Sequence, residues 1–579
     1  MFNISLTFNP SVYNPELPLY LDIETHGDMY NDVRLVQLYQ EGQDTVQVLD
    51  TNTYPLTEIY DFIKDFHVVA HNYSFEASCF ANDLKLYRNP FKQFSDTFLL
   101  ARIALPRLSA FNLAEVSKYI HGEDYYARFG VKKDMQLSFL DSAKSNKRAQ
   151  PCTQEQIEYA AMDVWVMPKI YNELKSYEQD FIIQLDYKAI SFIQKWQFYG
   201  LPVDQTKWAG YERLSLNAIV DAEKVIGDIN INSFVQVRKF LDRPNSDDQA
   251  LAEYSNQGVH GAAEIREKRK HVKRLNFLKR YNKERITGFF SPRTISGRTA
   301  SDSDNLQQIP RELKGLFGFE QEDPRYIVHA DYAALELRGL ACIINETVLI
   351  NLMRSGEDLH KYAASNIYKK PQSEITKEER MIGKFANFTL GYGAGANRFK
   401  DMLMKEADLL VSEAEARKIV NGWKNAYPTI KGWHADNNRK FEANRPYDVT
   451  LSGRNYTAKL YTDLNAIKIQ GSCAEVFKLA MVYLRKKDYK IMNAIHDSFL
   501  IEAQTLEEAR EIGSNLAKAM ITAWFEIMQQ ALVTDLPMPT DAEIAKNWGD
   551  IEKGKAEEVI SFAGTYEEYL SFRDEVWSW

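Results

Sequence analysis

Two short apolar segments, each carrying one aspartate, constrain the fold of this chain more than any other feature of its sequence. The segment 326–338 begins with the apolar run Tyr326–Ala330, which predicts a buried strand ending at Asp331. The segment 492–502 has the same design around Asp497. A carboxylate at the end of a buried strand is costly unless a cation neutralises it, and divalent metal ions take oxygen ligands. The segments therefore predict adjacent strands whose aspartates hold a pair of metal ions, as in polymerases and nucleases. For one aspartate alone, a helix cap at the surface is an equal alternative.

Length and composition set the broad class of the protein. The 579 residues are enough for about three or four domains, and 45% hydrophobic with 26% charged residues is ordinary for a soluble globular chain. The net charge of −9 excludes a generally basic coat but allows a local basic groove. The four cysteines form no Cys-x-x-Cys pair, which predicts reduced thiols and no zinc site. Neither a signal peptide nor an apolar run of about 18 residues is found, so we expect a cytoplasmic protein, in the host cytoplasm if viral, without a membrane span.

The N-terminal part of the chain carries a second acidic pattern. Residues 18–25 predict a short strand on which Asp22 and Glu24 share one face, because side chains two apart on a strand point the same way. Neighbouring carboxylates repel each other, and a bridging cation removes that cost. A second predicted strand leads into a polar turn that supplies Asn72 and Glu76.

A predicted helix adds Tyr159 and Asp163, one turn apart on one face. Each of these polar residues alone is more often a solvated charge or a cap. As an ordered set they resemble the three motifs of the 3′–5′ proofreading exonucleases, Asp-x-Glu, Asn-x-x-x-Asp and Tyr-x-x-x-Asp, with Glu76 replacing an Asp. The resemblance implies a ribonuclease H-like α/β fold. It also implies that metal ions held by Asp22, Glu24, Glu76 and Asp163 activate a water, oriented by Tyr159, against the terminal phosphodiester.

A basic stretch lies between the two acidic patterns. Residues 264–298 hold twelve Lys or Arg and three Glu, a net +9 in a chain whose total is −9. This density favours a surface that follows nucleic-acid phosphates with salt-dependent affinity, and a solvated helix face is the alternative. The stretch continues into polar loops at 295–301 and 305–310, whose amide and guanidinium donors suit sugar and minor-groove acceptors.

A further group of binding residues is predicted on a helix between the two aspartate segments. Arg380, Lys384, Phe388 and Tyr392 recur every four residues and are expected to share one helix face. Two cations one turn apart suit a triphosphate, and the aromatic rings beyond them suit a base and a sugar. An amphipathic helix with a basic edge is the alternative.

Together, the motifs within 295–548 resemble those of family A DNA polymerases, the family of the Klenow fragment and of many phage replicases. The segment from Asp331 resembles the family's Asp-Tyr-Ser-Gln-Ile-Glu-Leu-Arg, with Ala-Ala-Leu replacing Ser-Gln-Ile. The helix motif resembles Arg-x-x-x-Lys-x-x-x-Phe-x-x-x-Tyr-Gly without departure. The last motif resembles Val-His-Asp-Glu, with Ile495 and Ser498 as departures. With the exonuclease set, the resemblance covers nearly all of 18–550, without the 5′-nuclease domain or the thioredoxin-type insert of some relatives.

The resemblance implies a multidomain fold of α/β and α+β units, in which a ribonuclease H-like exonuclease domain precedes a right-hand polymerase. The implied parts are the exonuclease domain (1–185), thumb (186–290), first palm segment (291–344), fingers (345–445), second palm segment (446–550) and C-terminal tail (551–579). The tail is rich in acids and aromatics. We expect it to pack against the palm, and docking on a partner protein is the alternative.

The resemblance also implies roles for individual residues. Asp331, Asp497 and the carbonyl of Tyr332 are expected to hold two Mg²⁺ ions, which Mn²⁺ can replace, and two more are expected at the exonuclease site. The expected dNTP contacts are Arg380, Lys384, His360, Phe388 and Tyr392, with Glu336 excluding a ribose 2′-hydroxyl. The expected contacts to primer terminus and template are Arg298, Asn305, Gln307, Gln470 and His496. We expect Ser498 to be tolerated and not replaced by Glu502, which is ~13 Å farther along the strand.

The implied function is template-directed DNA synthesis from a primer 3′-OH with 3′–5′ proofreading, as in phage genome replication. Primer-template DNA and dNTPs are the expected ligands of a monomeric enzyme, and a helicase, a primase or a single-strand-binding protein is an expected partner. Two alternatives stay open. A single-subunit RNA polymerase shares this palm and the His-Asp-Ser form of the last motif, although Glu336 and an attached exonuclease argue against it. A DNA-binding scaffold with dead sites would need lost metal ligands, and both aspartates are present.

Overall fold

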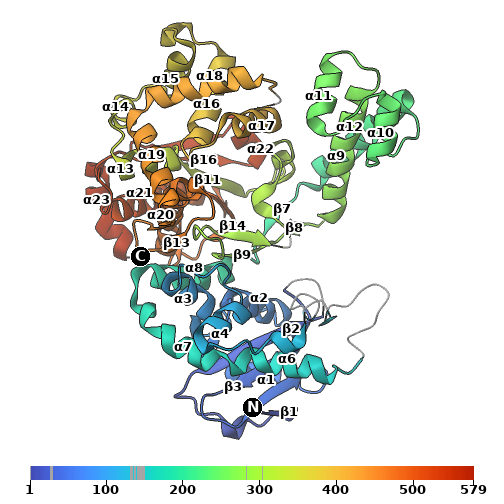
Figure 1. The fold of residues 1–579 in the computed structure, drawn as a ribbon, viewed down its shortest axis with the longest axis vertical. Coiled ribbons are helices and arrows are strands. Elements are labelled where there is room, and N and C mark those ends of the chain that lie inside the picture. The colour runs from blue at the N-terminus through green and yellow to red at the C-terminus, as the bar shows by residue number, and fades with distance from the viewer. Residues whose placement is uncertain are drawn as a thin grey trace.

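The computed structural model describes residues 2–26, 30–130, 135, 138–139, 150–281, 283–302, 304–407 and 409–578. Two lobes are stacked along the long axis, with the N-terminal lobe at the bottom of Figure 1 and the larger C-terminal lobe above it. A helical arm stands apart from the upper lobe on the right of that view. Among the described helices, none combines the length and the apolar composition needed to cross a membrane.

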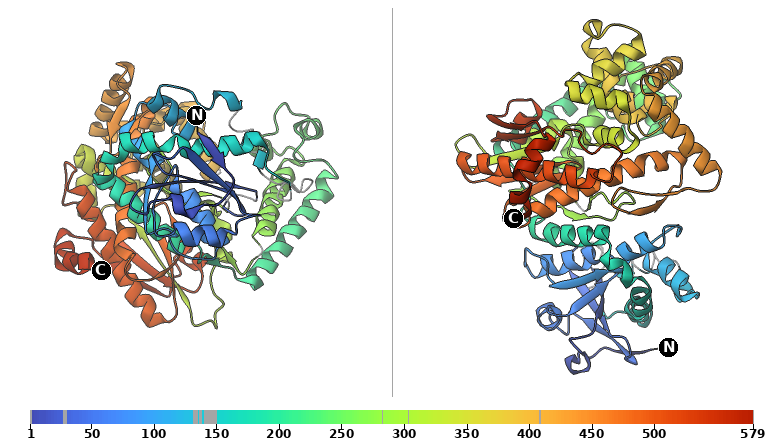
Figure 2. Two further views of the ribbon diagram at one scale, coloured as in Figure 1. Left: turned by 90° about the horizontal axis from the view of Figure 1, so that it is seen from below. Right: turned by 90° about the vertical axis from the view of Figure 1, so that its left-hand side faces the viewer.

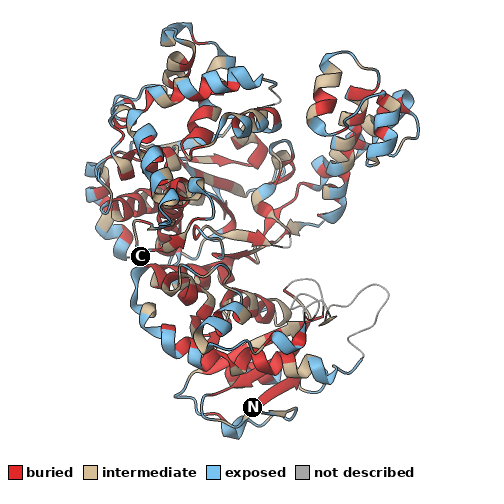
Figure 3. Cartoon of the chain, in the orientation of Figure 1, coloured by how far each residue is buried: buried red, intermediate tan, exposed pale blue. Residues whose placement is uncertain are grey.

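The N-terminal lobe is built on a six-stranded mixed sheet. In spatial order its strands are β1 (Asn3–Ser5), β4 (Thr45–Asp50), β3 (Val33–Tyr39), β2 (Leu19–Thr25), β5 (His67–Ala70) and β6 (Gln93–Asp96). Its helices are α1 (Leu56–Ile63), α2 (Tyr73–Asp83), α3 (Thr97–Ala104), α4 (Leu113–His121), α6 (Gln154–Trp165) and α7 (Met167–Leu174). Strand β2 lies centrally, antiparallel to β3 and parallel to β5. Every residue of β3 is buried, and Figure 3 shows the sheet as a buried layer. The expected α/β organisation is confirmed.

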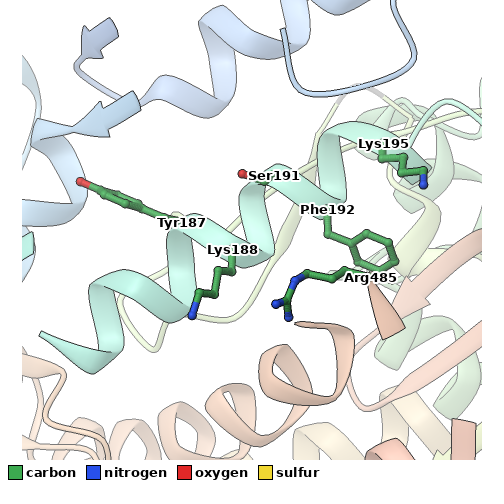
Figure 4. A pocket seen from close by; sticks show the side chains of 6 residues that line it. All are labelled: Tyr187, Lys188, Ser191, Phe192, Lys195 and Arg485. Carbon is green, nitrogen blue, oxygen red and sulfur yellow. The ribbon is translucent and has the colours of Figure 1, made fainter. Parts of the chain in front are cut away.

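Helix α8 (Phe181–Trp196) lies between the two lobes (Figure 2). Its Asp186 is fully buried and accepts hydrogen bonds from Arg454, at 2.7 Å, and from Lys478, both in the C-terminal lobe. The boundary predicted between residues 185 and 186 therefore falls inside a helix that is ion-paired to the upper lobe. A groove of about 340 Å³ follows the same helix, and Figure 4 shows the six side chains that line it.

The arm is a helical hairpin with its own small core. Its long helices α9 (Gln205–Ile226) and α12 (Ala262–Arg280) pack on each other, and α10 (Phe234–Leu241) and α11 (Asp248–Asn256) form the tip. Ile226, Val237, Leu251 and Ile265 belong to an apolar cluster separate from the main core. The short strands β7 (Leu201–Pro202) and β8 (Arg285–Ile286) pair at the base and close the arm as one unit.

The C-terminal lobe is organised on a five-stranded antiparallel sheet. In spatial order its strands are β14 (Lys490–Ile495), β15 (Ser498–Ala503), β11 (Tyr326–Tyr332), β16 (Thr540–Ala545) and β17 (Glu558–Phe562). Residue Asp331 on β11 is in register with Ser498 on β15, and Asp497 lies in the turn between β14 and β15. The predicted adjacency of the two aspartate segments is confirmed, because β11 and β15 are direct neighbours. Asp497 occupies a hairpin turn rather than the middle of a strand.

Helices between β11 and β14 cover this sheet and rise above it (Figure 1). They are α13 (Leu335–Ile344), α14 (Thr347–Ser355), α15 (Leu359–Tyr368), α16 (Lys377–Leu390), α17 (Ala396–Ala407), α18 (Glu413–Ala426), α19 (Pro428–Glu442) and α20 (Tyr461–Leu484), with the hairpin β12 (Tyr447–Val449) and β13 (Asn455–Thr457) before α20. One predicted helix bound was wrong. Helix α16 ends at Leu390, so Tyr392 lies in the following turn. Helix α20 begins at Tyr461, and Gly471 is a packing position inside it: a Cβ there would lie 2.5 Å from Cγ2 of Thr450.

The C-terminal tail packs on the lobe, as expected. Strand β17 pairs with β16, and α23 (Tyr566–Ser578) packs on α21 (Leu506–Met528). The buried side chains of α23 are Tyr569, Phe572 and Val576. The Tyr569 ring lies 5.1 Å from that of Phe525 between centroids.

Deleting residues 555–579 is expected to lower the melting temperature by several degrees. The deletion removes three buried apolar side chains, each worth about 1.5–3 kcal/mol. Trp577→Ala is the matched control, because this side chain is 46% exposed and should change the melting temperature little. Equal melting temperatures for the deleted and full-length proteins in differential scanning calorimetry would contradict the packing.

Candidate active sites

The C-terminal site is the pair Asp331 and Asp497. The Tyr332 N–H donates to the backbone carbonyl of Asp497 at 3.4 Å, and the two carboxyl groups share a hydrogen bond. Asp331 lies on the open side of the sheet, yet loss of water to the surrounding protein raises its pKa well above the usual range, and the charge of Asp497 raises it further. His496 has a left-handed φ of 53°, which turns the chain between β14 and β15 and brings Asp497 over β11.

This donor set fits a divalent cation. Two carboxylates that share a proton in a desolvated site are stabilised when a cation replaces that proton. A third carboxylate, Glu543 on β16, is close enough for its charge to raise the pKa of Asp331, and it lies 3.2 Å from Nδ1 of His329. The sequence analysis missed Glu543, because nothing in the sequence indicates which residue of β16 lies beside the aspartate on β11. Glu502 instead pairs with Arg285 at 2.6 Å and is not part of the site.

Arg298 and Glu336 form an ion pair beside the two aspartates. With His496, Asp497 and Cys473 they line a cavity of about 30 Å³. Burial and then the charge of Asp497 raise the pKa of Glu336 to about 8, while the adjacent guanidinium favours its charged form. A cavity of this volume is too small for a sugar ring.

The polar residues predicted to contact DNA lie around this cavity. Gln307 donates from Nε2 to the carbonyl of Ala494 at 3.3 Å, two residues before His496. Asn305 accepts the Gln307 N–H at 3.1 Å and so shapes the turn that presents this amide. Gln470 lies on α20, the helix that contributes Cys473 to the cavity. Burial and then the charge of Arg298 lower the pKa of His496, which keeps its ring neutral at neutral pH.

Helices α15 and α16 bring the predicted cationic group together. Arg380 pairs with Asp358, the N-cap of α15, at 2.7 Å, an interaction that the motif alone did not indicate. Gly383 allows the helices to touch, since a Cβ there would lie 2.2 Å from the carbonyl of His360. Lys384 and Phe388 are exposed on the same helix, and Tyr392 lies beyond its end.

Hydrogen bonds fix the tautomer of His360. The buried Trp423 indole donates to Oδ1 of Asn387 at 2.8 Å, so the Asn387 amide presents its NH₂ to Nδ1 of His360 at 3.2 Å. Nδ1 is therefore an acceptor and Nε2 carries the proton. Burial and then the charge of Arg380 lower the His360 pKa to about 4, so at neutral pH the ring is a neutral N–H donor. Its centroid lies 5.9 Å from that of Phe388.

The N-terminal site joins Asp22 and Glu24 of β2 with Asp163 of α6. One ligand atom from each carboxylate lies within 4.8 Å of the others, a spacing that could hold a metal ion. Alternation along β2 puts the first two on one face, and the contact of α6 with β2 brings the third. Helix α6 spans Gln154–Trp165, so the helix predicted around Tyr159 and Asp163 is confirmed.

Orphaned polar atoms beside this cluster support a cation there. Glu76, on α2, is 2% exposed, and burial followed by the charge of Asp22 raises its pKa well above the usual range. Among the described residues, its Oε2 and the hydroxyl of Tyr159 have no hydrogen-bond partner although both atoms are buried, a state that a bound ion and its water would relieve. Glu76 lies outside the 4.8 Å group. Tyr126, which no motif marks, donates to Asp163 at 2.5 Å.

Most cations of the basic stretch are engaged inside the protein. Arg269 donates hydrogen bonds to the backbone carbonyls of Ile231 and Ser246. Eight of the twelve are in ion pairs: Arg266, Lys268, Lys270, Arg274, Arg280, Arg285, Arg293 and Arg298. Over the described residues of this stretch, the cations with neither an ion pair nor such backbone hydrogen bonds are Lys273, Lys279 and Lys283, all exposed. The positive surface open to a ligand is smaller than the charge count predicted.

Comparison with known proteins decides the family. Residues 221–550 match the family model of DNA polymerase family A, and residues 8–177 match that of the 3′–5′ exonuclease. The chain belongs to DNA polymerase family A. It carries a 3′–5′ exonuclease domain ahead of the polymerase domain, which confirms the family and the domain types that the motifs indicated.

Several curated relatives are similar to this polymerase. DNA polymerase I of Aquifex aeolicus is 26% identical over 590 residues, covering 92% of this chain and 95% of the relative. DNA polymerase I of Borreliella burgdorferi is 31% identical over 287 residues, 46% of this chain and 30% of the relative. The DNA polymerase of Bacillus phage SP01 is 25% identical over 296 residues, 46% of this chain and 32% of the relative. Apart from the Aquifex enzyme, these matches span about a third of the relative's length.

A solved structure shares the fold. The POL domain of Pol1 from M. smegmatis, in complex with DNA primer-template and dNTP, superposes with a TM-score of 0.70 at 18% identity. The superposition covers 93% of this chain and 96% of that one, so the arrangement of both lobes is a known one.

Ser498→Ala is expected to keep the turnover number of nucleotide addition within about tenfold, a barrier change of roughly 1.4 kcal/mol. The Ser498 hydroxyl donates to the carbonyl of Ile495 at 3.2 Å, so its proton already has a partner in the backbone. Asp497→Ala is the comparison and should lose several orders of magnitude more. If the two substitutions proved equally damaging in folded proteins, Ser498 would belong to the metal site.

Proposed function

We propose that this enzyme adds deoxynucleotides to a primer 3′-OH under template direction and removes mispaired ends with its 3′–5′ exonuclease. The observation that carries the proposal is the Asp331–Asp497 pair beside Glu336 and Arg298, on the sheet of a family A polymerase domain. The M. smegmatis neighbour holds primer-template DNA and a dNTP, which we take as the ligands of this chain too.

The proposed parts of the polymerase follow from the architecture. The helical arm is the thumb, the five-stranded sheet is the palm, and α14–α19 are the fingers. The product duplex lies between thumb and palm, and the triphosphate lies between fingers and palm. The sequence boundaries of 186–290 for the thumb and 345–445 for the fingers remain predictions.

At the polymerase site, Asp331, Asp497 and the Tyr332 carbonyl would hold two Mg²⁺ ions, which would activate the primer 3′-OH and stabilise charge on the transferred phosphate. Arg380 and Lys384 bind the triphosphate, and the incoming phosphates compete with Asp358 for Arg380. His360 donates its Nε2 proton to a phosphate oxygen. Phe388 and Tyr392 form the nucleotide pocket.

Selectivity and primer contact come from the residues around the small cavity. Glu336 occupies the space that a ribose 2′-hydroxyl would need, which favours DNA over the single-subunit RNA polymerase alternative. Arg298 and His496 contact the primer terminus, while Asn305, Gln307 and Gln470 contact bases and sugars in the minor groove. In this proposal the Arg298–Glu336 ion pair parts when the nucleotide enters.

At the exonuclease site, Asp22, Glu24, Asp163 and Glu76 would hold the metal ions that activate the attacking water. The Tyr159 hydroxyl, which has no partner in the part of the chain that the structure describes, orients that water. Tyr126 holds the Asp163 carboxylate in position through its hydrogen bond. We further propose that the enzyme serves replication in a bacteriophage, in view of the similar polymerase of Bacillus phage SP01.

The two sites are expected to be separable. Asp331→Asn should abolish primer extension and leave 3′–5′ degradation, because it removes a ligand from one site only. Asp22→Ala combined with Glu24→Ala should abolish degradation and leave extension. Both activities are measured on one labelled primer-template, with and without dNTPs. Loss of both activities from either variant, with the fold intact by circular dichroism, would refute separate sites.

The thumb's free cations are expected to set the salt dependence of DNA binding. Replacing Lys273, Lys279 and Lys283 by alanine should flatten the log–log plot of primer-template affinity against salt by about 0.9 per lost phosphate contact. Fluorescence anisotropy across a salt series measures the slope.

The matched control removes the same charge elsewhere. Lys64, Lys92 and Lys118 each pair with a neighbouring aspartate on the exonuclease domain. Their replacement by alanine should leave the slope unchanged. Similar slopes for the two triple variants would mean that the three thumb lysines are exposed to solvent and do not contact the DNA phosphates.

A further inference from the structure

The turn that precedes Arg298 is held by the exonuclease domain. Arg102, on α3, donates hydrogen bonds to the backbone carbonyls of Arg293 and, at 2.8 Å, of Thr294. The Thr294 carbonyl also accepts the Gly297 N–H at 2.9 Å, which closes the turn. From its side chain, Thr294 donates to the carbonyl of Arg298 at 2.8 Å. Arg102 therefore acts on the backbone that sets the direction of Arg298.

A second guanidinium blocks the other side of this turn. Gly297 has a φ of +75°, and a Cβ there would lie 2.5 Å from Nε of Arg454. Arg454 is 3% exposed and is fixed by Asp186 at 2.7 Å. The turn is clamped between one cation from each lobe. Burial and the nearby charge of Arg454 lower the pKa of Arg102 to about 10, so Arg102 is still charged at neutral pH.

The exonuclease domain also contacts the segment 289–302 on both sides of this turn. Tyr30, of the exonuclease domain, stacks on Phe289 with ring centroids 4.2 Å apart and an interplanar angle of 18°. Its hydroxyl donates to Asp302 at 2.8 Å, and Asp302 pairs with Arg293. Residues 289–302 thus meet the exonuclease domain at both ends and in the middle.

We propose that Arg102 is a positioning residue of the polymerase reaction, supplied by the exonuclease domain, and that it holds the turn 294–297 so that Arg298 is directed at the primer terminus. The proposal rests on the proposed role of Arg298. Helix α3 makes the link short and stiff. Its N-cap is Asp96, whose carboxylate accepts the Asn72 N–H of the second exonuclease motif at 3.0 Å, and its last turn carries Arg102. The exonuclease domain is then a structural component of the polymerase site.

The test compares Arg102→Ala and Arg102→Lys, both with Asp22→Ala and Glu24→Ala as a common background that removes degradation. Single-nucleotide addition should lose about tenfold in kcat/KM in the alanine variant, the factor expected for charge-assisted hydrogen bonds. Lysine, whose ammonium group can still donate to the carbonyls, should restore part of the lost kcat/KM. With Asp22 and Glu24 intact, degradation of single-stranded DNA by Arg102→Ala should be unchanged.

Arg107→Ala is the matched control. Arg107 also reaches from the exonuclease domain to the polymerase domain, but its guanidinium packs on the ring of Tyr447, 5.3 Å from the centroid, and not on the turn 294–297. This variant should retain the kcat/KM of the background enzyme. If Arg107→Ala lowered kcat/KM as much as Arg102→Ala does, the effect would come from contact between the domains in general, and the proposal would be overturned.

A double-mutant cycle with Arg298→Ala separates positioning from general stability. If Arg102 acts through Arg298, Arg102→Ala should cost nothing further once Arg298 is alanine. If Arg102→Ala still lowered kcat/KM tenfold in the Arg298→Ala background, the proposal would be overturned. It would also be overturned if Arg298→Ala lowered kcat/KM and Arg102→Ala left it unchanged. An Arg298→Ala enzyme with unaltered kcat/KM would instead remove the proposed role of Arg298, on which the inference rests.

Discussion

The relation between the two lobes depends on one buried group of charges. Asp186 and Glu475 are fully buried, Lys478 is 1% exposed and Arg454 is 3% exposed. A lone charge at such a depth would cost several kcal/mol, so each of the four requires its partners to be in place. The group ties α8 to α20 and to the turn after β12. The ion pairs hold these elements against each other, and the relative position of the two active sites depends in part on them.

The active sites follow the opposite rule, since they concentrate charge of one sign. Asp331, Asp497 and Glu543 meet on one face of the palm sheet, and Asp22, Glu24 and Asp163 meet at the end of β2. Repulsion and desolvation make both clusters unfavourable for the folded protein alone. Cation binding offsets that cost. Without a cation, the surrounding packed structure must hold the repelling carboxylates together. The clamped turn before Arg298 is part of the same packed structure.

Local patterns predicted the elements that carry these clusters. The apolar runs before Asp331 and around Asp497 became neighbouring strands, and the alternation of Asp22 and Glu24 put both on one face. One error arose at a helix end: Tyr392 continues the fourfold spacing although its helix has already ended. Spacing alone cannot distinguish a residue inside a helix from one just beyond it.

The sequence by itself determined the strands and helices, the carboxylates of both sites and the family, because these depend on residue type and short-range spacing. Only the tertiary structure decided which charges stay available. It paired most of the basic stretch internally, joined Asp358 to Arg380 and aimed Arg102 of one domain at the backbone of another. The energy of an ion pair or a hydrogen bond decreases with distance, so these interactions need their partners to be close. The packing of the whole chain, and no local pattern, sets the distances between remote segments.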